Sequence, residues 1–222
     1  MNSMSMSGGT TMSMAWMPMC GQSWMAAASS FLGMWTVMMA AMMLPSLIPG
    51  LWRYRRAAGR VGTLSAALLT VPAAAGYFLV WTVMGAVVYP AGSAVMALVM
   101  RYPALARAAP FATGVVVVVA GTLQFSRWRS HHLACCREGC GPQGGSAWRY
   151  GVGLGLHCVQ CCAGLTAALL VTGIMDMPLM LVATAAITLE RLAPAGRRVA
   201  QLIGTVVLGA GLALIGRASG LS

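Results

Sequence analysis

Long apolar stretches separated by short polar segments dominate the chain after residue 30. Six of these stretches are candidates for helices that cross the roughly 30 Å hydrocarbon core of a bilayer, at a rise of about 1.5 Å per residue. They cover residues 31–51, 64–89, 110–125, 151–173, 177–192 and 199–215. The pattern predicts an all-α fold, a polytopic helical membrane bundle of about six transmembrane helices.

One further apolar stretch, residues 91–109, contains Arg101, Pro103 and Arg107. A charge at the centre of a bilayer costs at least about 2.5 kcal/mol. We therefore expect this stretch to form an amphipathic helix at the membrane surface and not a span. The polar segment 126–148 is predicted to be a loop.

The beginning of the chain is polar and of low complexity, with Ser, Gly, Thr and repeated Met. It lacks the basic region followed by an apolar core that marks a secretory signal. We expect residues 1–28 to form a Met-rich, flexible outer tail and residues 29–222 to form the helical membrane domain. Most of the tail, up to Trp24, is expected to be disordered.

Composition supports the membrane interpretation. Hydrophobic residues make up 59% of the 222 residues and charged residues only 8%, whereas soluble proteins carry about 25% charged residues. Such a chain cannot cover its apolar surface by folding alone. A soluble enzyme, a disordered protein and a secreted disulfide scaffold are excluded, and the lipid bilayer is the first expected partner.

The basic residues indicate orientation. The net charge is +11 and all 14 basic residues are arginine, but no basic stripe with interleaved aromatic residues suggests nucleic-acid binding. Arginines accumulate in cytoplasmic loops. With the N-terminus outside, three arginines lie outside (Arg101, Arg107 and Arg217) and eleven inside (Arg53, Arg55, Arg56, Arg60, Arg127, Arg129, Arg137, Arg149, Arg191, Arg197 and Arg198). Both termini are therefore predicted outside, and segment 126–148 in the reducing cytoplasm.

The strongest chemical signal is the sequence His157-Cys158-Val159-Gln160-Cys161-Cys162 within the fourth apolar stretch. At 3.6 residues per turn the three thiols and the imidazole share one stripe of a helix. Sulfur-rich ligand sets without a carboxylate favour copper(I), and tetrahedral zinc also accepts such ligands. The alternative interpretation is that each cysteine is a small buried hydrophobic residue.

Methionines are unusually frequent, with 19 in the chain. Five repeat along one side of the first stretch (Met34, Met38, Met39, Met42 and Met43), and three flank Asp176 (Met175, Met177 and Met180). Thioethers are soft ligands that suit copper(I). Methionine is also ordinary flexible filler in apolar helices, so Met38, Met42 and Met175 are candidates on pattern alone.

A second group of possible ligands lies in segment 126–148: His131, His132, Cys135, Cys136 and Cys140. Their spacing suits zinc or copper, and the alternative is an arginine-rich loop with incidental thiols. Among the acids, Asp176 is a candidate to complete a metal shell. Glu190 is expected to be a solvated charge paired with Arg191 or a neighbouring arginine at the cytoplasmic face.

Several motifs together resemble a known family. They are Trp35-x2-Met38-x2-Ala41-Met42-Met43-Leu44-Pro45, Gly76-Tyr77-x3-Trp81, Gly121-x2-Gln124, Cys136-Arg137, Trp148-Arg149-x-Gly151, Gly155-x2-Cys158-x2-Cys161-Cys162, Gly173-x-Met175 and Glu190 before a basic residue. The chain resembles the bacterial predicted metal-binding integral membrane proteins. The resemblance implies a bacterial inner membrane location and binding of a metal, copper above all, through Cys and Met. His132-Leu133 stands where that family usually has Cys-Leu, and Gln160, Asp176 and Arg191 replace Gly, Asn and Lys.

Three functions follow as hypotheses. The first is a membrane protein that binds copper(I) or hands it to a copper-receiving protein, with no catalytic residues. Its candidate ligands are Cys158, Cys161, Cys162, His157, Met38, Met42, Cys136, His132, Met175 and Asp176. The second is a membrane thiol-disulfide oxidoreductase that uses the Cys158/Cys161 pair. The third is a ligand-free assembly partner held by small-residue packing at Gly151-x3-Gly155.

Overall fold

A computed structural model of the chain describes residues 3–5, 11–13, 23–57, 63–138, 146–173, 176–193 and 196–220. Two short strands, β1 (Ser3–Ser5) and β2 (Thr11–Ser13), pair in antiparallel fashion. The remaining elements are helices: α1 (Trp24–Ala57), α2 (Thr63–Arg101), α3 (Pro103–Leu123), α4 (Arg127–Glu138), α5 (Ala147–Thr172), α6 (Met177–Leu192) and α7 (Gly196–Ala218). The predicted helical bundle is confirmed, with the β1–β2 hairpin as an addition.

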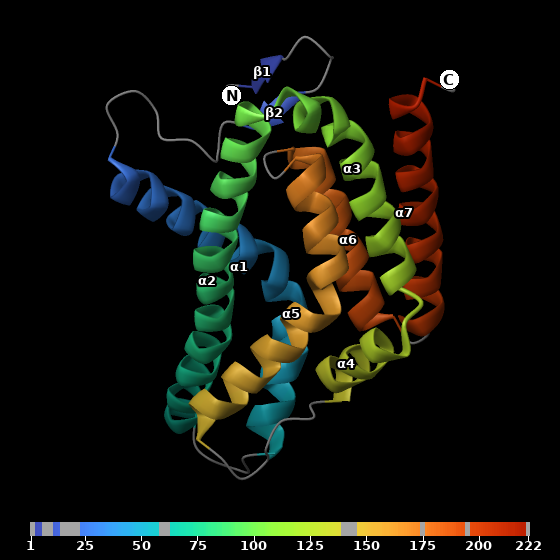
Figure 1. Ribbon diagram of the computed structural model, residues 1–222. Coiled ribbons are helices and arrows are strands. Elements are labelled where there is room, and N and C mark those ends of the chain that lie inside the picture. The colour runs from blue at the N-terminus through green and yellow to red at the C-terminus, as the bar shows by residue number, and fades with distance from the viewer. Residues whose placement is uncertain are drawn as a thin grey trace.

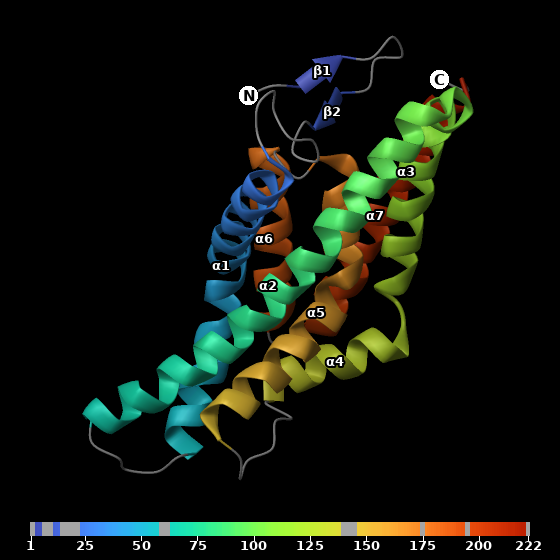
Figure 2. The ribbon, with the colours of Figure 1, turned by 60° about the vertical axis from the view of Figure 1, so that its left-hand side comes forward.

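The long helices run up and down the long axis of the molecule, while the shorter α4 lies across one end (Figures 1 and 2). Within the described residues, five helices are long and apolar enough to cross a membrane, namely α1, α2, α3, α5 and α7. The 16-residue α6 runs alongside them but is shorter. The fold is therefore that of a helical protein suited to a membrane.

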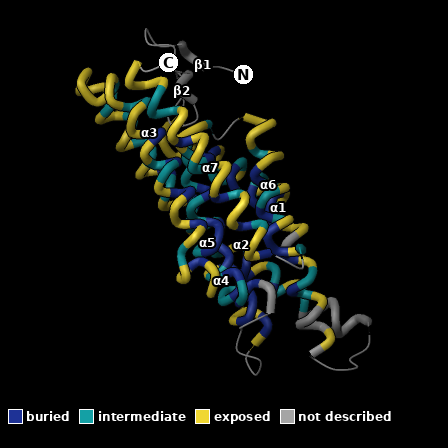
Figure 3. The backbone as a smooth tube through the Cα atoms, turned by 90° about the vertical axis from the view of Figure 1, so that its right-hand side faces the viewer, coloured by how far each residue is buried: buried dark blue, intermediate teal, exposed yellow. Residues whose placement is uncertain are grey.

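The outer surface of the bundle is apolar. Exposed residues line the outside of the helices in Figure 3, and large hydrophobic side chains such as Val37, Leu181 and Val206 are 70%, 69% and 72% exposed. Soluble monomers rarely expose apolar patches on this scale. Lipid contact accounts for this surface, consistent with a membrane protein.

The predicted surface helix over residues 91–109 is wrong. Helix α2 continues through this region to Arg101, and α3 begins at Pro103. Tyr102 between them is extended, with φ −121° and ψ 102°. Proline disfavours the helical conformation in the residue before it and suits the first position of a new helix, so Pro103 separates two long helices.

The predicted loop over residues 126–148 is also wrong in its first half, which forms α4. Arg129, Leu133 and Cys136 are all buried on one side of α4, whereas Arg127 and Trp128 are exposed. The polar composition hid this 3.6-residue period. In the tail, the described residues pair as the β1–β2 hairpin, and α1 begins at Trp24. The expectation of disorder concerns residues that mostly lie outside the described ranges.

Tight contacts between α2 and α5 fix the centre of the bundle. A Cβ on Gly76 would lie 2.7 Å from the carbonyl oxygen of Trp148, and one on Gly151 would collide with the carbonyl of Ala73. Glycine lets the two backbones approach this closely. Buried residues concentrate where α5 meets its neighbours (Figure 3), and this is the region that carries the candidate ligands.

Candidate metal centre

Four cysteines from two helices converge in the core. We call Cys136 on α4 and Cys158, Cys161 and Cys162 on α5 the thiol cluster. The Sγ atom of Cys161 lies 3.9 Å from that of Cys136 and 3.6 Å from that of Cys162. All four side chains are buried and all four thiols are free. The predicted stripe on α5 therefore faces the protein interior, and α4 adds a thiol to it.

A thioether and a phenol border the thiol cluster. The Sδ atom of Met43 on α1 is 3.8 Å from the Sγ atom of Cys158, and the Tyr77 hydroxyl on α2 is 2.9 Å from the same sulfur. Met43 and Tyr77 are fully buried. Helices α1, α2 and α4 thus each bring one soft or polar group to the three thiols of α5.

The guanidinium of Arg191, near the end of α6, lies among these sulfurs. Its Nη2 atom donates to Cys158 at 2.8 Å, to Cys161 at 3.1 Å and to Cys162 at 3.5 Å. A charge buried this deeply needs groups that accept its hydrogen bonds and balance its charge. Within the described residues, no three His, Cys, Asp or Glu side chains are already arranged around a vacant metal position. The guanidinium is the cation that the sulfurs surround in this structure.

A buried ion pair lies beside the cluster. Arg129 on α4 forms a salt bridge with Glu190 on α6, and its Nε atom donates to the carbonyl oxygen of Cys161 at 2.9 Å. Glu190 is only 2% exposed. Its expected neighbouring arginine is present, but the expectation of a solvated charge is wrong, because α4 and α6 enclose the pair. This ion pair ties α4, α5 and α6 together around the thiols.

Two histidines lie one helical turn from the thiol cluster. The Nδ1 atoms of His132 on α4 and His157 on α5 are 2.9 Å apart. Each histidine precedes a cluster cysteine by four residues. His132 therefore shares a face of α4 with Cys136, and His157 shares a face of α5 with Cys161. Burial lowers the pKa of His132, and the nearby His157 and His131 lower it further. A neutral imidazole is the form that binds metals.

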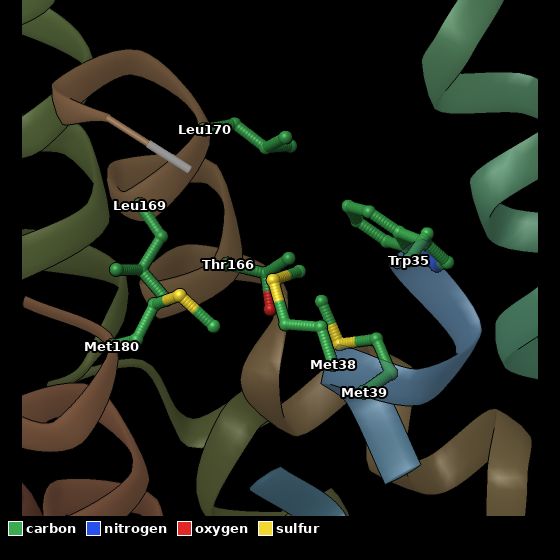
Figure 4. Close-up of a pocket in the computed structure, with 7 residues that line it drawn as sticks. All are labelled: Trp35, Met38, Met39, Thr166, Leu169, Leu170 and Met180. Atoms are coloured by element: carbon green, nitrogen blue, oxygen red, sulfur yellow. The ribbon is translucent and has the colours of Figure 1, made fainter. Parts of the chain in front are cut away.

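The other predicted ligands have different surroundings. Met38 lines a small apolar pocket with Met39 and Met180 (Figure 4), and Met42 is buried in the core. Asp176 caps α6, accepting a hydrogen bond from the backbone N–H of Leu179 at 3.4 Å. It is fifteen residues from Arg191, or about 22 Å along α6. Met175 and Cys140 lie outside the described residues.

Sequence reasoning did not bring Arg191, Tyr77 and Met43 together with the cysteines. Arg191 was interpreted as an orientation signal and as a partner for Glu190, Met43 as one of a stripe of soft donors on the first span, and Tyr77 only as part of a longer motif. Helical periodicity shows which residues share one face of a helix, but it does not show which residues of other helices pack against that face. The signal for Tyr77 and Met43 was present in the family-like motifs, whereas nothing in the sequence pointed Arg191 toward sulfur.

The fold and the site together define a class: a helical membrane protein with a buried, sulfur-rich centre of soft donors. The chain belongs to the family described as PpoB2, copper chaperone, whose sequence model matches residues 32–214. This match confirms the resemblance to a copper-associated bacterial family and supports a copper-related role. The matched segment contains the thiol cluster, Arg191 and both histidines of the pair. Searches among curated proteins and among solved structures gave no match.

Proposed function

We propose that this protein binds copper(I) in the thiol cluster, within the membrane, and hands it to a copper-receiving protein. One observation carries the proposal: four thiols and the Met43 thioether, from α1, α4 and α5, lie in one buried place. Thiolate and thioether ligands are soft donors that suit copper(I). Membership of a copper chaperone family supports the same cargo.

Arg191 fits this proposal as a charge partner. Two thiolates that hold one copper(I) ion carry a net charge of −1, which is costly in an apolar core unless a cation lies beside it. Arg191 already donates to three sulfurs of the cluster. Copper(I) would bind sulfurs that accept hydrogen bonds from Arg191, and the guanidinium would remain next to the complex as its counter-charge.

The route for the ion starts, in this proposal, at the histidine pair. His132 and His157 are only partly buried, and they lie one turn from Cys136 and Cys161. Neutral imidazoles and thiolates both bind copper, so the ion can be exchanged between two adjacent sets of ligands. No nucleotide-binding motif is present in the sequence, and transfer is then driven by the affinity of the receiving protein.

The arrangement of the chain completes the proposal. We place the protein in the bacterial inner membrane with six spans, α6 being the short one, and with the α4 end in the cytoplasm. Residues 1–28 form an outer tail and residues 29–222 the membrane domain. Asp176, which caps the far end of α6, and Met38, which lines the apolar pocket, are left out of the proposed ligand set, and Met42 and Met175 are retained only as candidates.

Copper(I) titration of the detergent-purified protein against a chromophoric competitor tests the function. Alanine at Cys158, Cys161 and Cys162 together should weaken copper(I) binding by more than about 100-fold, because loss of outer-shell groups alone typically costs 10–100-fold. The matched control is Cys135→Ala, which removes another buried thiol of α4 that is not part of the thiol cluster. The control should keep the affinity of the unmodified protein.

Equal affinities in the triple variant and the unmodified protein would overturn the proposal, as would an equal loss in Cys135→Ala. Mass spectrometry of the same samples tests the alternative of a thiol-disulfide oxidoreductase. A reversible Cys158–Cys161 disulfide, with quinone-dependent turnover and no copper binding, would favour that alternative instead.

A further inference from the structure

A basic cleft opens at the end of the bundle where α3 ends, α4 begins and α7 begins. Its volume is about 480 Å³, within the 300–1,000 Å³ that is usual for small-molecule sites. The polar part of its lining consists of Gln124, Arg127, Arg129, Arg197, Gln201 and two serines, Ser126 and Ser130. The cleft is separate from the thiol cluster, although Arg129 borders both.

The positive charge of this cleft is not balanced by a carboxylate within its described lining. The sequence contains three acidic residues, Glu138, Asp176 and Glu190. Glu190 pairs with Arg129, and Asp176 caps α6 at the other end of that helix. Glu138 ends α4, about 16 Å along the helix from Arg127. No acidic residue is among those that line the cleft, so Arg127 and Arg197 face it without a carboxylate from the described lining.

Gln124 adds an independent sign of a missing partner. It is 4% exposed and lines the cleft, yet neither its amide nitrogen nor its amide oxygen has a hydrogen-bond partner among the described residues. Buried amides are almost always paired, because leaving them unpaired is costly. An occupant of the cleft that accepts and donates hydrogen bonds would satisfy both atoms.

Two helix N-termini also meet at the cleft. Arg127 is the first residue of α4 and Arg197 is the second residue of α7. The first turn of a helix carries partial positive charge and unpaired backbone N–H groups, which favour anions. Together with the arginines and Gln124, they make the cleft complementary to an anion with several acceptor oxygens.

We propose that this cleft binds a phosphate group that carries an organic substituent. Arginine matches phosphate through paired, charge-assisted hydrogen bonds, and the Gln124 amide can add a donor. The volume exceeds what a bare phosphate fills, and Phe125 and Leu133 give the cleft apolar walls. A glycerophosphate group, from an anionic phospholipid headgroup or from a soluble phosphate ester, has this chemistry.

The test measures thermal unfolding and native mass spectra of the full chain in nanodiscs. One arm uses neutral phosphatidylcholine discs with added glycerol 3-phosphate, and the other uses discs that contain phosphatidylglycerol. At a ligand concentration of 100 times Kd, binding should raise the unfolding midpoint by about 5 °C. Which arm responds identifies the source of the phosphate.

Substitutions localise the effect. Arg127→Gln combined with Arg197→Gln should abolish the stabilisation and the bound mass in the responding arm. Arg198→Gln is the matched control, because it removes an equally exposed charge from the adjacent position of α7, outside the cleft lining. Gln124→Met removes the buried amide while keeping a side chain of similar length, and it should weaken binding at least about tenfold.

No stabilisation and no bound mass in either arm would overturn the proposal. So would a response that the Arg127→Gln/Arg197→Gln variant retains, or one that Arg198→Gln removes to the same extent. Arg127 and Arg197 are exposed, so these substitutions should not prevent folding, and unchanged copper(I) affinity in them would confirm that.

Discussion

Each buried charge in the core of this protein is matched by a specific neighbour. Arg191 has the sulfurs of Cys158, Cys161 and Cys162, and Arg129 has Glu190 and a backbone carbonyl. Two arginines could not remain in an apolar bundle without such partners. The buried arginines and the groups that accept their hydrogen bonds therefore stabilise each other in the core.

The Arg129–Glu190 pair gives the first residue-scale prediction. Glu190→Gln should lower the free energy of unfolding by about 3 kcal/mol, because it leaves a buried guanidinium without its counter-charge. The double variant Arg129→Met/Glu190→Leu should be less destabilised than the sum of its single variants. Chemical unfolding in detergent micelles measures Glu190→Gln, Arg129→Met, Glu190→Leu and the double variant, and strict additivity would contradict a coupled ion pair.

Helix α4 shows what a whole element contributes. It is short and polar, yet it supplies Arg129 to the ion pair, His132 to the histidine pair and Cys136 to the thiol cluster. These positions recur at intervals of three and four residues, so they share the side of α4 that packs on α5. In Figure 1, α4 lies below the lower ends of α3 and α7 and beside α5.

Packing of α5 against α2 gives the prediction at this scale. Gly151→Ala should destabilise the protein by about 1–3 kcal/mol, since the added Cβ meets the α2 backbone at Ala73. It should also weaken copper(I) binding, because α2 carries Tyr77 to Cys158. Thermal unfolding and copper(I) titration in detergent measure the two effects.

Gly153→Ala is the matched control for that substitution. It lies on the same helix, and an added Cβ there meets nothing within 4 Å. Alanine should be neutral or stabilising at this position by up to about 1 kcal/mol, through its higher helix propensity. Equal behaviour of the two alanine variants would show that close α2–α5 contact does not matter for stability.

Across the whole molecule, the arginines separate into two groups at opposite ends. Arg101, Arg107 and Arg217 belong to the end where α2 meets α3 and α7 finishes. The other end, with α4 and the starts of α5 and α7, holds more of them: Arg127, Arg129, Arg149, Arg191, Arg197 and Arg198. The richer end also borders the histidine pair and the basic cleft.

The proposed orientation rests on this distribution, because arginine-rich ends tend to stay in the cytoplasm. With Cys20 and Cys140 replaced by serine, a cysteine at Ser219 should react with an impermeant maleimide in intact cells. One at Ser146 should react only after the membrane is permeabilised; both positions are exposed. The opposite pattern would invert the orientation, and labelling of both from the same side would contradict six spans.

The sequence by itself determined the helical membrane class, the family and the α5 stripe of His157, Cys158, Cys161 and Cys162. These features depend on local periodicity and apolarity, which the chain carries in its order of residues. The same local reasoning failed at Pro103, where a helix boundary was taken for a surface helix, and at α4, where polar composition concealed a buried face.

Only the tertiary structure decided which groups meet that stripe. Met43, Tyr77, Cys136 and Arg191 come from four other helices, and their contacts depend on how those helices cross. It also decided that Glu190 is buried with Arg129 and that Asp176 is a helix cap. Periodicity fixes which face of a helix is apolar or polar, but the partner of that face is set by packing between segments far apart in the chain.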